Sequence, residues 1–164
     1  MALNNPRVGT SVNLPNGAKY DILLIQTPQG YPVSQLSFDF GLTPRKIAGI
    51  EKVAQTFAKI LFTTYGSDVI RKDLGTEFPN LVIGANTIGD VGELRMSVTQ
   101  AVNDAESQTR QCLNGYSLDP SSQLRSATIT TLDVGIDSIT LYIRIITNSG
   151  TSAAIAIPFP QLNL

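Results

Sequence analysis

The stretch that decides the fold covers residues 43–66 and reads TPRKIAGIEKVAQTFAKILFTTYG. Thr43 can cap the first backbone N–H groups of a helix, and Pro44 suits the first helical position because its missing N–H has no partner there. Gly66 can take the left-handed conformation that ends a helix. Apolar side chains recur at three- and four-residue steps, and they are Ile47, Ile50, Ala54, Phe57 and Leu61. The stretch therefore predicts an amphipathic helix with one buried face.

A second helix is predicted from Asp90, where Glu93 stands three residues later as in a capping box. Gly115 is its candidate stop. Between the two helices we expect an extended segment at residues 67–75 and a loop at residues 76–80. The apolar positions of the second helix again follow helical spacing, and they are Val91, Leu94, Val98, Ala101, Val102, Ala105 and Cys112.

The last third of the chain changes to the two-residue period of β-strands. Residues 124–134 are rich in Thr and Ile, residues 138–147 alternate apolar and polar side chains, and residues 151–157 follow a turn at residues 148–150. These segments predict successive antiparallel strands. The predicted fold class is therefore α+β, with two main helices packed on a small antiparallel or mixed sheet of about three to five strands.

The length of 164 residues suits one domain with attached arms. Residues 1–35 are expected to form an extended N-terminal arm or hairpin, because the first ten are polar and Pro15-Asn16-Gly17 favours a turn. Residues 36–157 would form the domain itself. Residues 158–164 are expected to form a tail, because proline has no N–H for a central strand.

Composition narrows the classes of function. The formal net charge is −1 and 15% of the residues are charged, so we expect no broad cationic surface for nucleic acid or anionic lipid. No apolar run approaches the ~20 residues that span a bilayer, and we expect no signal sequence from the first residues. The chain has no histidine and the single cysteine Cys112, which argues against His-dependent triads and zinc sites. We therefore expect no catalytic residue, no cofactor and no metal.

Residues 57–75, FAKILFTTYGSDVIRKDLG, resemble the signature of the baseplate wedge or sheath-initiator family of contractile-tailed bacteriophages. That family has a related component in type VI secretion systems. Its helix ends in a pattern like I-L-x-T-x-x-G, and an extended segment, a turn, a second helix and strands follow. The order of elements and the positions of Gly66 and Gly75 agree over residues 42–157, whereas Leu74 stands where an aromatic residue is expected.

The resemblance implies a non-enzymatic, structural subunit of the tail baseplate. Such a subunit would initiate the sheath by joining the wedge to the first ring of sheath subunits, whose arms add to its sheet as extra strands. The implied partners are the tail sheath protein, the wedge core proteins and, as a further candidate, the tail tube, but neither nucleic acid nor a membrane. The implied location is the virion, in the tail baseplate, after assembly in the host cytoplasm.

The family's short Glu-Pro-Arg motif, implicated in holding the wedge core, has no intact copy in this chain. The nearest match is Asp119-Pro120 followed by Arg125, and the pair Glu106 and Arg110 is the other candidate. The alternative is a plain turn followed by a solvated arginine. By the same resemblance, the final predicted strand would receive the sheath arms, and its expected binding residues are Thr151, Ala153, Ile155 and Ile157.

Two other functions stay open from the sequence. Some family members carry a lysozyme label, and a tail-associated, peptidoglycan-cleaving enzyme would need two carboxyl groups about 5 to 10 Å apart. A tail ring or connector protein that closes into rings is the second alternative. The acids available for glycan cleavage are Glu77, Glu93, Asp104 and Glu106.

Overall fold

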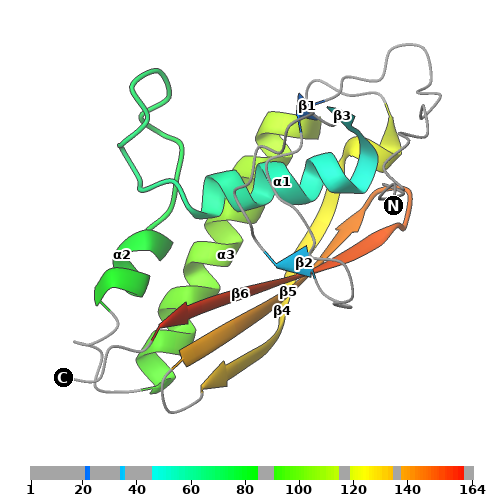
Figure 1. Ribbon diagram of the computed structural model, residues 1–164. Helices are drawn as coiled ribbons and strands as arrows, with labels where there is room; N and C mark the ends of the chain where they lie inside the picture. The colour runs from blue at the N-terminus through cyan, green and yellow to red at the C-terminus, as the bar shows by residue number, and fades with distance from the viewer. Residues whose placement is uncertain are drawn as a thin grey trace, which may run out of the picture.

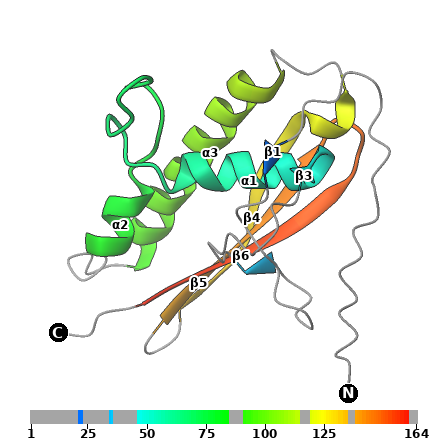
Figure 2. The same ribbon diagram turned by 45° about the horizontal axis from the view of Figure 1, so that its top comes forward.

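The structure is a computed structural model that describes residues 21–22, 34–35, 46–84, 91–114, 119–134 and 138–160. Helices α1 and α3 lie on the same face of a sheet, and α2 packs against α3 (Figures 1 and 2). This arrangement confirms the predicted α+β class. The elements are β1 (Asp21–Ile22), β2 (Ser34–Gln35), β3 (Lys46–Ile47), α1 (Gly49–Leu61), α2 (Phe78–Gly84), α3 (Val91–Asn114), the 3-10 helix η2 (Pro120–Ser122), β4 (Leu124–Val134), β5 (Ser138–Thr147) and β6 (Ser152–Pro160).

The main sheet has the strand order β2-β6-β5-β4. Strands β4, β5 and β6 are consecutive and antiparallel, whereas β2 adds two residues parallel to β6. A turn after β5 is closed by a hydrogen bond of 2.9 Å from the Gly150 N–H to the Thr147 carbonyl. The bounds of β4 and β5 are those predicted, because alternation and turn residues are local signals that no other part of the chain overrides here.

Strand β6 extends to Pro160, three residues beyond the predicted end. The Thr147 N–H donates to the Thr151 carbonyl at 2.9 Å, so Thr151 turns its backbone groups toward β5. Backbone groups alternate sides along a strand, so Pro158 and Pro160 turn theirs away from β5. Proline is tolerated there because its missing N–H would not have bonded to β5.

Helix α1 is shorter than predicted at both ends. Lys46 and Ile47 belong to β3, which pairs with β1, and Thr43 and Pro44 lie outside the described residues. Gly49, the first residue of α1, has a φ of +59°, and this left-handed conformation prevents a right-handed helix from continuing back through it to Thr43. Its N-terminal neighbour Ala48 makes no side-chain cap. At the other end the helix stops at Leu61, and Gly66 lies in the following loop.

The connection from α1 to α2 also differs from the prediction. Residues 67–75 form turns instead of an extended segment, and α2 begins at Phe78 within the predicted loop. The Thr76 hydroxyl organises this change, because it accepts a hydrogen bond from the Phe78 N–H at 3.1 Å and donates to the Leu61 carbonyl at 2.8 Å. It thereby links the end of α1 to the start of α2.

The core lies between the helical layer and the sheet. The α3 face is buried from Leu94 to Ala105 as predicted, whereas Val91 is 54% exposed and Cys112 is only partly buried. The ring of Phe78 contacts two other rings edge-on, with centroid distances of 5.5 and 5.9 Å. Asp90 and Gly115 lie outside the described residues. Side chains at most 2% exposed come from every layer, and they include Val53, Phe57, Leu61, Val98, Val102, Leu141, Ile143 and Ile145.

Most of the predicted N-terminal arm, residues 1–35, lies outside the described residues, apart from β1 and β2. Among the described helices, none combines the length and apolar character that crossing a membrane requires. The described residues contain no group of three acidic, cysteine or histidine side chains placed to hold a metal ion.

Candidate functional site

The candidate site is the outer edge of β4. The strand order puts β4 at one end of the sheet, so within the described residues only β5 pairs with it. An edge strand presents a row of unpaired backbone N–H and C=O groups that can pair with another extended chain. At 11 residues, β4 is the longest strand described, which makes its edge the longest in the sheet.

Three side chains of α3 bond to the first part of this edge, and we call them the polar ladder: Glu106, Arg110 and Asn114. They are spaced four residues apart, so they lie on one face of the helix. The Asn114 amide accepts from the Leu124 N–H at 3.1 Å and donates to the Leu124 carbonyl at 3.3 Å. The guanidinium of Arg110 donates to the Arg125 carbonyl and pairs with the Glu106 carboxylate at 2.5 Å.

The last contact of the polar ladder fixes which way the β4 backbone faces. The Ala127 N–H donates to the Glu106 carboxylate at 3.0 Å, so it turns away from β5. The backbone of Ile129 turns the same way, because successive residues alternate. A register shift between Ile129 and Thr131 inserts one residue, after which Leu132 and Val134 turn outward. These three residues carry the outward-facing groups beyond the ladder.

The opposite side of the sheet, where the two-residue strand β2 lies beside β6, is different. Strand β2 already pairs there with Ile155 and Ala156. Of the residues predicted on this strand, Thr151, Ala153, Ile155 and Ile157 share one parity, so their backbone groups face β5. The side chains of Ile155 and Ile157 are buried in the core. The backbone groups of these four residues therefore face a strand of the chain's own sheet.

The other predicted contact region contains a tight turn. Asp119 precedes η2, and its carboxylate accepts from the hydroxyl and the N–H of Ser121 at 2.6 and 3.0 Å. These bonds lower the pKa of Asp119, the hydroxyl contributing most. Pro120 accepts from the Ser149 N–H at 3.2 Å, which ties η2 to the turn after β5. Pro120 and Arg125 are exposed, and the Arg125 carbonyl accepts from the guanidinium of Arg110, which belongs to the alternative candidate pair.

An ordered loop between α1 and α2 is a surface feature that the sequence did not predict. It projects from the body in both ribbon views and presents Val69 and Ile70, which are 89% and 92% exposed (Figures 1 and 2). The Asp68 carboxylate accepts from the N–H groups of Arg71 and Ile70 at 2.9 and 2.8 Å, and these bonds lower its pKa. The only sign of this loop in the sequence is the apolar pair Val69 and Ile70 between the charged residues Asp68 and Arg71.

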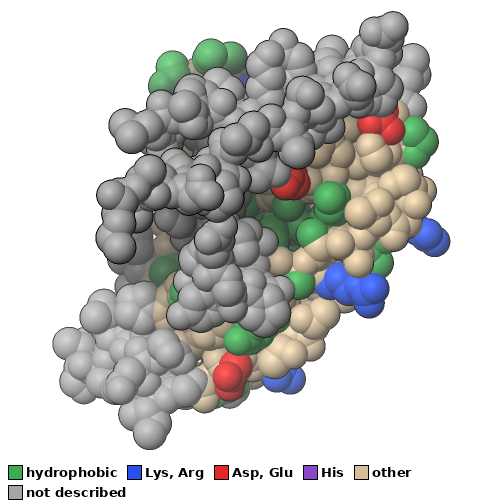
Figure 3. All heavy atoms as spheres, turned by 45° about the vertical axis from the view of Figure 1, so that its right-hand side comes forward, with side chains coloured by type: hydrophobic (Ala, Val, Ile, Leu, Met, Phe, Trp, Pro, Cys, Tyr) green, Lys and Arg blue, Asp and Glu red, His purple; other side chains and the backbone are tan. Residues whose placement is uncertain are grey.

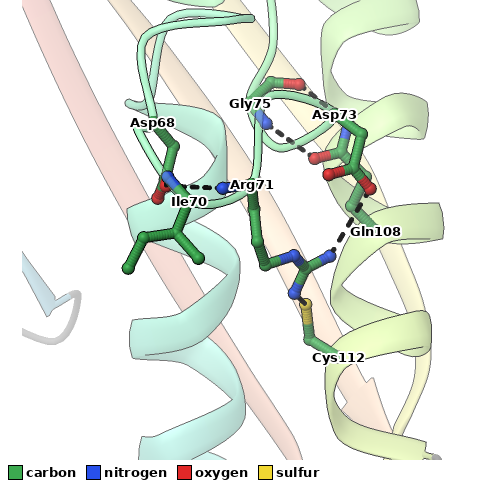
Figure 4. A network of polar contacts seen from close by, with 7 residues as sticks. All are labelled: Asp68, Ile70, Arg71, Asp73, Gly75, Gln108 and Cys112. Atoms are coloured by element: carbon green, nitrogen blue, oxygen red, sulfur yellow. Dashed lines mark hydrogen bonds and ion pairs between the residues drawn. The ribbon is translucent and has the colours of Figure 1, made fainter.

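Helix α3 holds the base of this loop (Figure 4). The Gln108 amide accepts from the Gly75 N–H at 2.8 Å and donates to the Gly75 carbonyl at 2.7 Å. Arg71 donates to the Cys112 sulfur at 3.0 Å and lies 3.8 Å from the Asp73 carboxylate. Cys112 is thus a packing and hydrogen-bonding residue of the loop base.

Comparison with known proteins gave one solved structure and no family. The chain is similar to a protein of Geobacter sulfurreducens called a "putative tail lysozyme", with a TM-score of 0.46 and 19% sequence identity over 69% of this chain and 91% of that chain. No protein-family model matches the chain, and no curated protein matches it. That neighbour is a tail protein by name, whereas membership of the baseplate wedge or sheath-initiator family stays a prediction. The prediction that the chain is not an enzyme is contradicted by the same name, and we withdraw it.

Proposed function

We propose that the chain is a subunit of a contractile phage tail baseplate that initiates the sheath. In this role it joins the wedge to the first ring of sheath subunits by strand pairing. The observation that carries the proposal is the β4 edge, whose outward groups beyond Ala127 have no strand beside them in the described residues. Such an edge binds an extended segment through main-chain hydrogen bonds and needs no particular side-chain chemistry.

Two further features support the proposal. The resemblance of residues 57–75 to the sheath-initiator signature points to the same kind of subunit. On the face drawn in Figure 3, the described part of the surface carries only scattered Lys, Arg, Asp and Glu side chains, which suits packing among protein neighbours. We propose Asp119 and the exposed Pro120 and Arg125 as the contact with the wedge core. The exposed side chain of Thr151, directly before β6, stays a candidate contact for the sheath.

The proposal predicts what happens when the chain is removed from an assembling tail. Phage that lack the gene for this chain should make baseplates and tubes but no attached sheath, because the first sheath ring has no strand to pair with. Electron micrographs of purified particles, scored for sheathed tails, measure the effect, and the wild-type gene supplied in trans should restore them. Sheaths of normal length on particles without the chain would overturn the proposal.

Two rival functions are separated by assays on the purified chain. Cleavage of peptidoglycan, lost on a single replacement such as Glu77→Gln, would make the chain a glycan-cleaving enzyme. Three of the acids that the sequence offers for glycan cleavage have hydrogen-bond partners in the structure. Glu77 accepts from the Asn80 amide at 2.7 Å, Asp104 accepts from Gln100 at 2.8 Å, and Glu106 belongs to the polar ladder. Closed rings seen by native mass measurement would indicate a tail ring protein.

A further inference from the structure

We infer that the incoming strand binds the outer edge of β4 over residues 128–134, and that the polar ladder of α3 fixes where this strand must stop. The inference rests on the proposed function, since the occupant is an extended segment of a neighbouring tail subunit. The sequence analysis expected the sheath arm to bind β6, whereas this inference assigns the arm to β4, at the other side of the sheet.

The β6 edge is closed to a long added strand. Strand β2 takes the pairing positions at Ile155 and Ala156. Beyond them the next outward-facing residues are Pro158 and Pro160, neither of which has an N–H to donate. An added strand would therefore find only Ser152 and Ala154 open on one side of β2 and a stretch without donors on the other.

The first part of the β4 edge is closed as well. The outward groups of Leu124, Arg125 and Ala127 are bonded to the polar ladder. An incoming strand that extended past residue 128 toward Leu124 would have to displace these bonds, and two of them involve members of the ion pair between Glu106 and Arg110. The ladder thus acts as a stop for strand addition.

The second part of the β4 edge has the properties of an acceptor. Ile129, Leu132 and Val134 turn their backbone groups outward, and nothing in the described residues bonds to them. Natural edge strands are protected by prolines, lysines and β-bulges, and of these residues 128–134 contain only the bulge after Ile129. Their one charged residue is Asp133. Seven strand residues span roughly 23 Å, enough for a short extended arm.

The register shift favours a different chain over a second copy of this one. A bulge leaves one extra residue between Ile129 and Thr131, and it bends the strand locally. Two copies paired through this edge would bring two bulges into the same short ladder, and their hydrogen bonds would fall out of register. A regular extended segment of another protein meets only one bulge.

A pair of double variants tests the role of the backbone donors. Leu132→Pro with Val134→Pro removes two outward N–H groups, whereas Leu132→Ala with Val134→Ala removes the same side chains and keeps both donors. We expect the proline variant to enter baseplates and to yield about tenfold fewer sheathed tails, because two hydrogen bonds are lost. The alanine variant should yield sheathed tails within about twofold of wild type. Equal yields from the two variants would overturn the inference.

Hydrogen exchange of the wild-type chain gives a readout that does not depend on how the variants fold. The amides of Ile129, Leu132 and Val134 should exchange quickly in the free chain and at least about tenfold more slowly in assembled tails. The amide of Ala127 is the internal control, because its bond to Glu106 should protect it in both states. Fast exchange at all three amides in assembled tails would overturn the inference, as would their protection in a dimer of the free chain.

The two proposals fail in different ways in this experiment. If the chain is absent from tails, or if sheaths form without it, the proposed function itself fails. If the chain is present and required while the β4 amides stay unprotected, the proposed function stands and only the assignment of the edge is lost.

Discussion

At the scale of single residues, Gly75 has the least room for a side chain among the described glycines with positive φ. Its φ is +117°, and a Cβ built there would lie 2.6 Å from the Thr63 carbonyl oxygen, a backbone atom that cannot swing aside. The close approach exists because residues 64 and 76 form a parallel bridge at the base of the loop. Gly66, in the same loop, has a φ of +79° but nothing within 4 Å of such a Cβ.

This contrast predicts unequal effects of the same substitution. Gly75→Ala should lower the free energy of unfolding by about 3 kcal/mol or more, because steric overlap adds to backbone strain. Gly66→Ala should lower it by about 1–2 kcal/mol, the cost of the left-handed conformation alone. Urea unfolding followed by circular dichroism measures both. Equal losses would show that the backbone at Thr63 moves aside.

At the scale of elements, sequence patterns predicted the strands and helix faces that depend on neighbouring residues in the chain. The strands β4 and β5 follow from alternation, and the buried face of α3 follows from helical spacing. The start of α1 could not be predicted in the same way, since Lys46 and Ile47 pair with β1, which is distant in sequence. Helix α2 was missed because the Thr76 hydroxyl organises its start through a contact with Leu61.

The candidate site shows the same limit. That the chain offers a sheet edge was predictable from its strands, but the free edge was not, because strand order is a property of the folded sheet. Only part of the polar ladder could be predicted from the sequence. Glu106 and Arg110 stood out as a pair on one helix, whereas their common target on β4 is formed by tertiary packing.

The ladder makes a prediction about how α3 and β4 hold together. Asn114→Ala should lower the free energy of unfolding by about 1–2 kcal/mol, because the N–H and carbonyl of Leu124 both lose their partner. The matched control is Gln111→Ala on an exposed position of the same helix, which should change stability by less than about 0.5 kcal/mol. Chemical denaturation measures both variants, and similar values for the two would show that the Asn114 bonds contribute nothing.

At the scale of the whole molecule, stability is concentrated between the helical layer and the sheet, while the loop after α1 stands apart from that interface. Two isoleucines ten residues apart report on this division. Ile60 is 2% exposed within the core, whereas Ile70 is 92% exposed at the tip of the loop. Ile60→Ser should lower the free energy of unfolding by about 3 kcal/mol or more, because it leaves a cavity and buries a hydroxyl.

Ile70→Ser should leave that free energy within about 0.5 kcal/mol of wild type, since the side chain has almost no contacts to lose. It should also raise the solubility of the purified chain, because the exposed apolar pair Val69 and Ile70 is broken. Thermal unfolding and light scattering of the two variants measure these effects side by side. A loss of stability in Ile70→Ser comparable to that in Ile60→Ser would mean that the loop folds against the body in solution, and the division between a packed interface and a projecting loop would then be wrong.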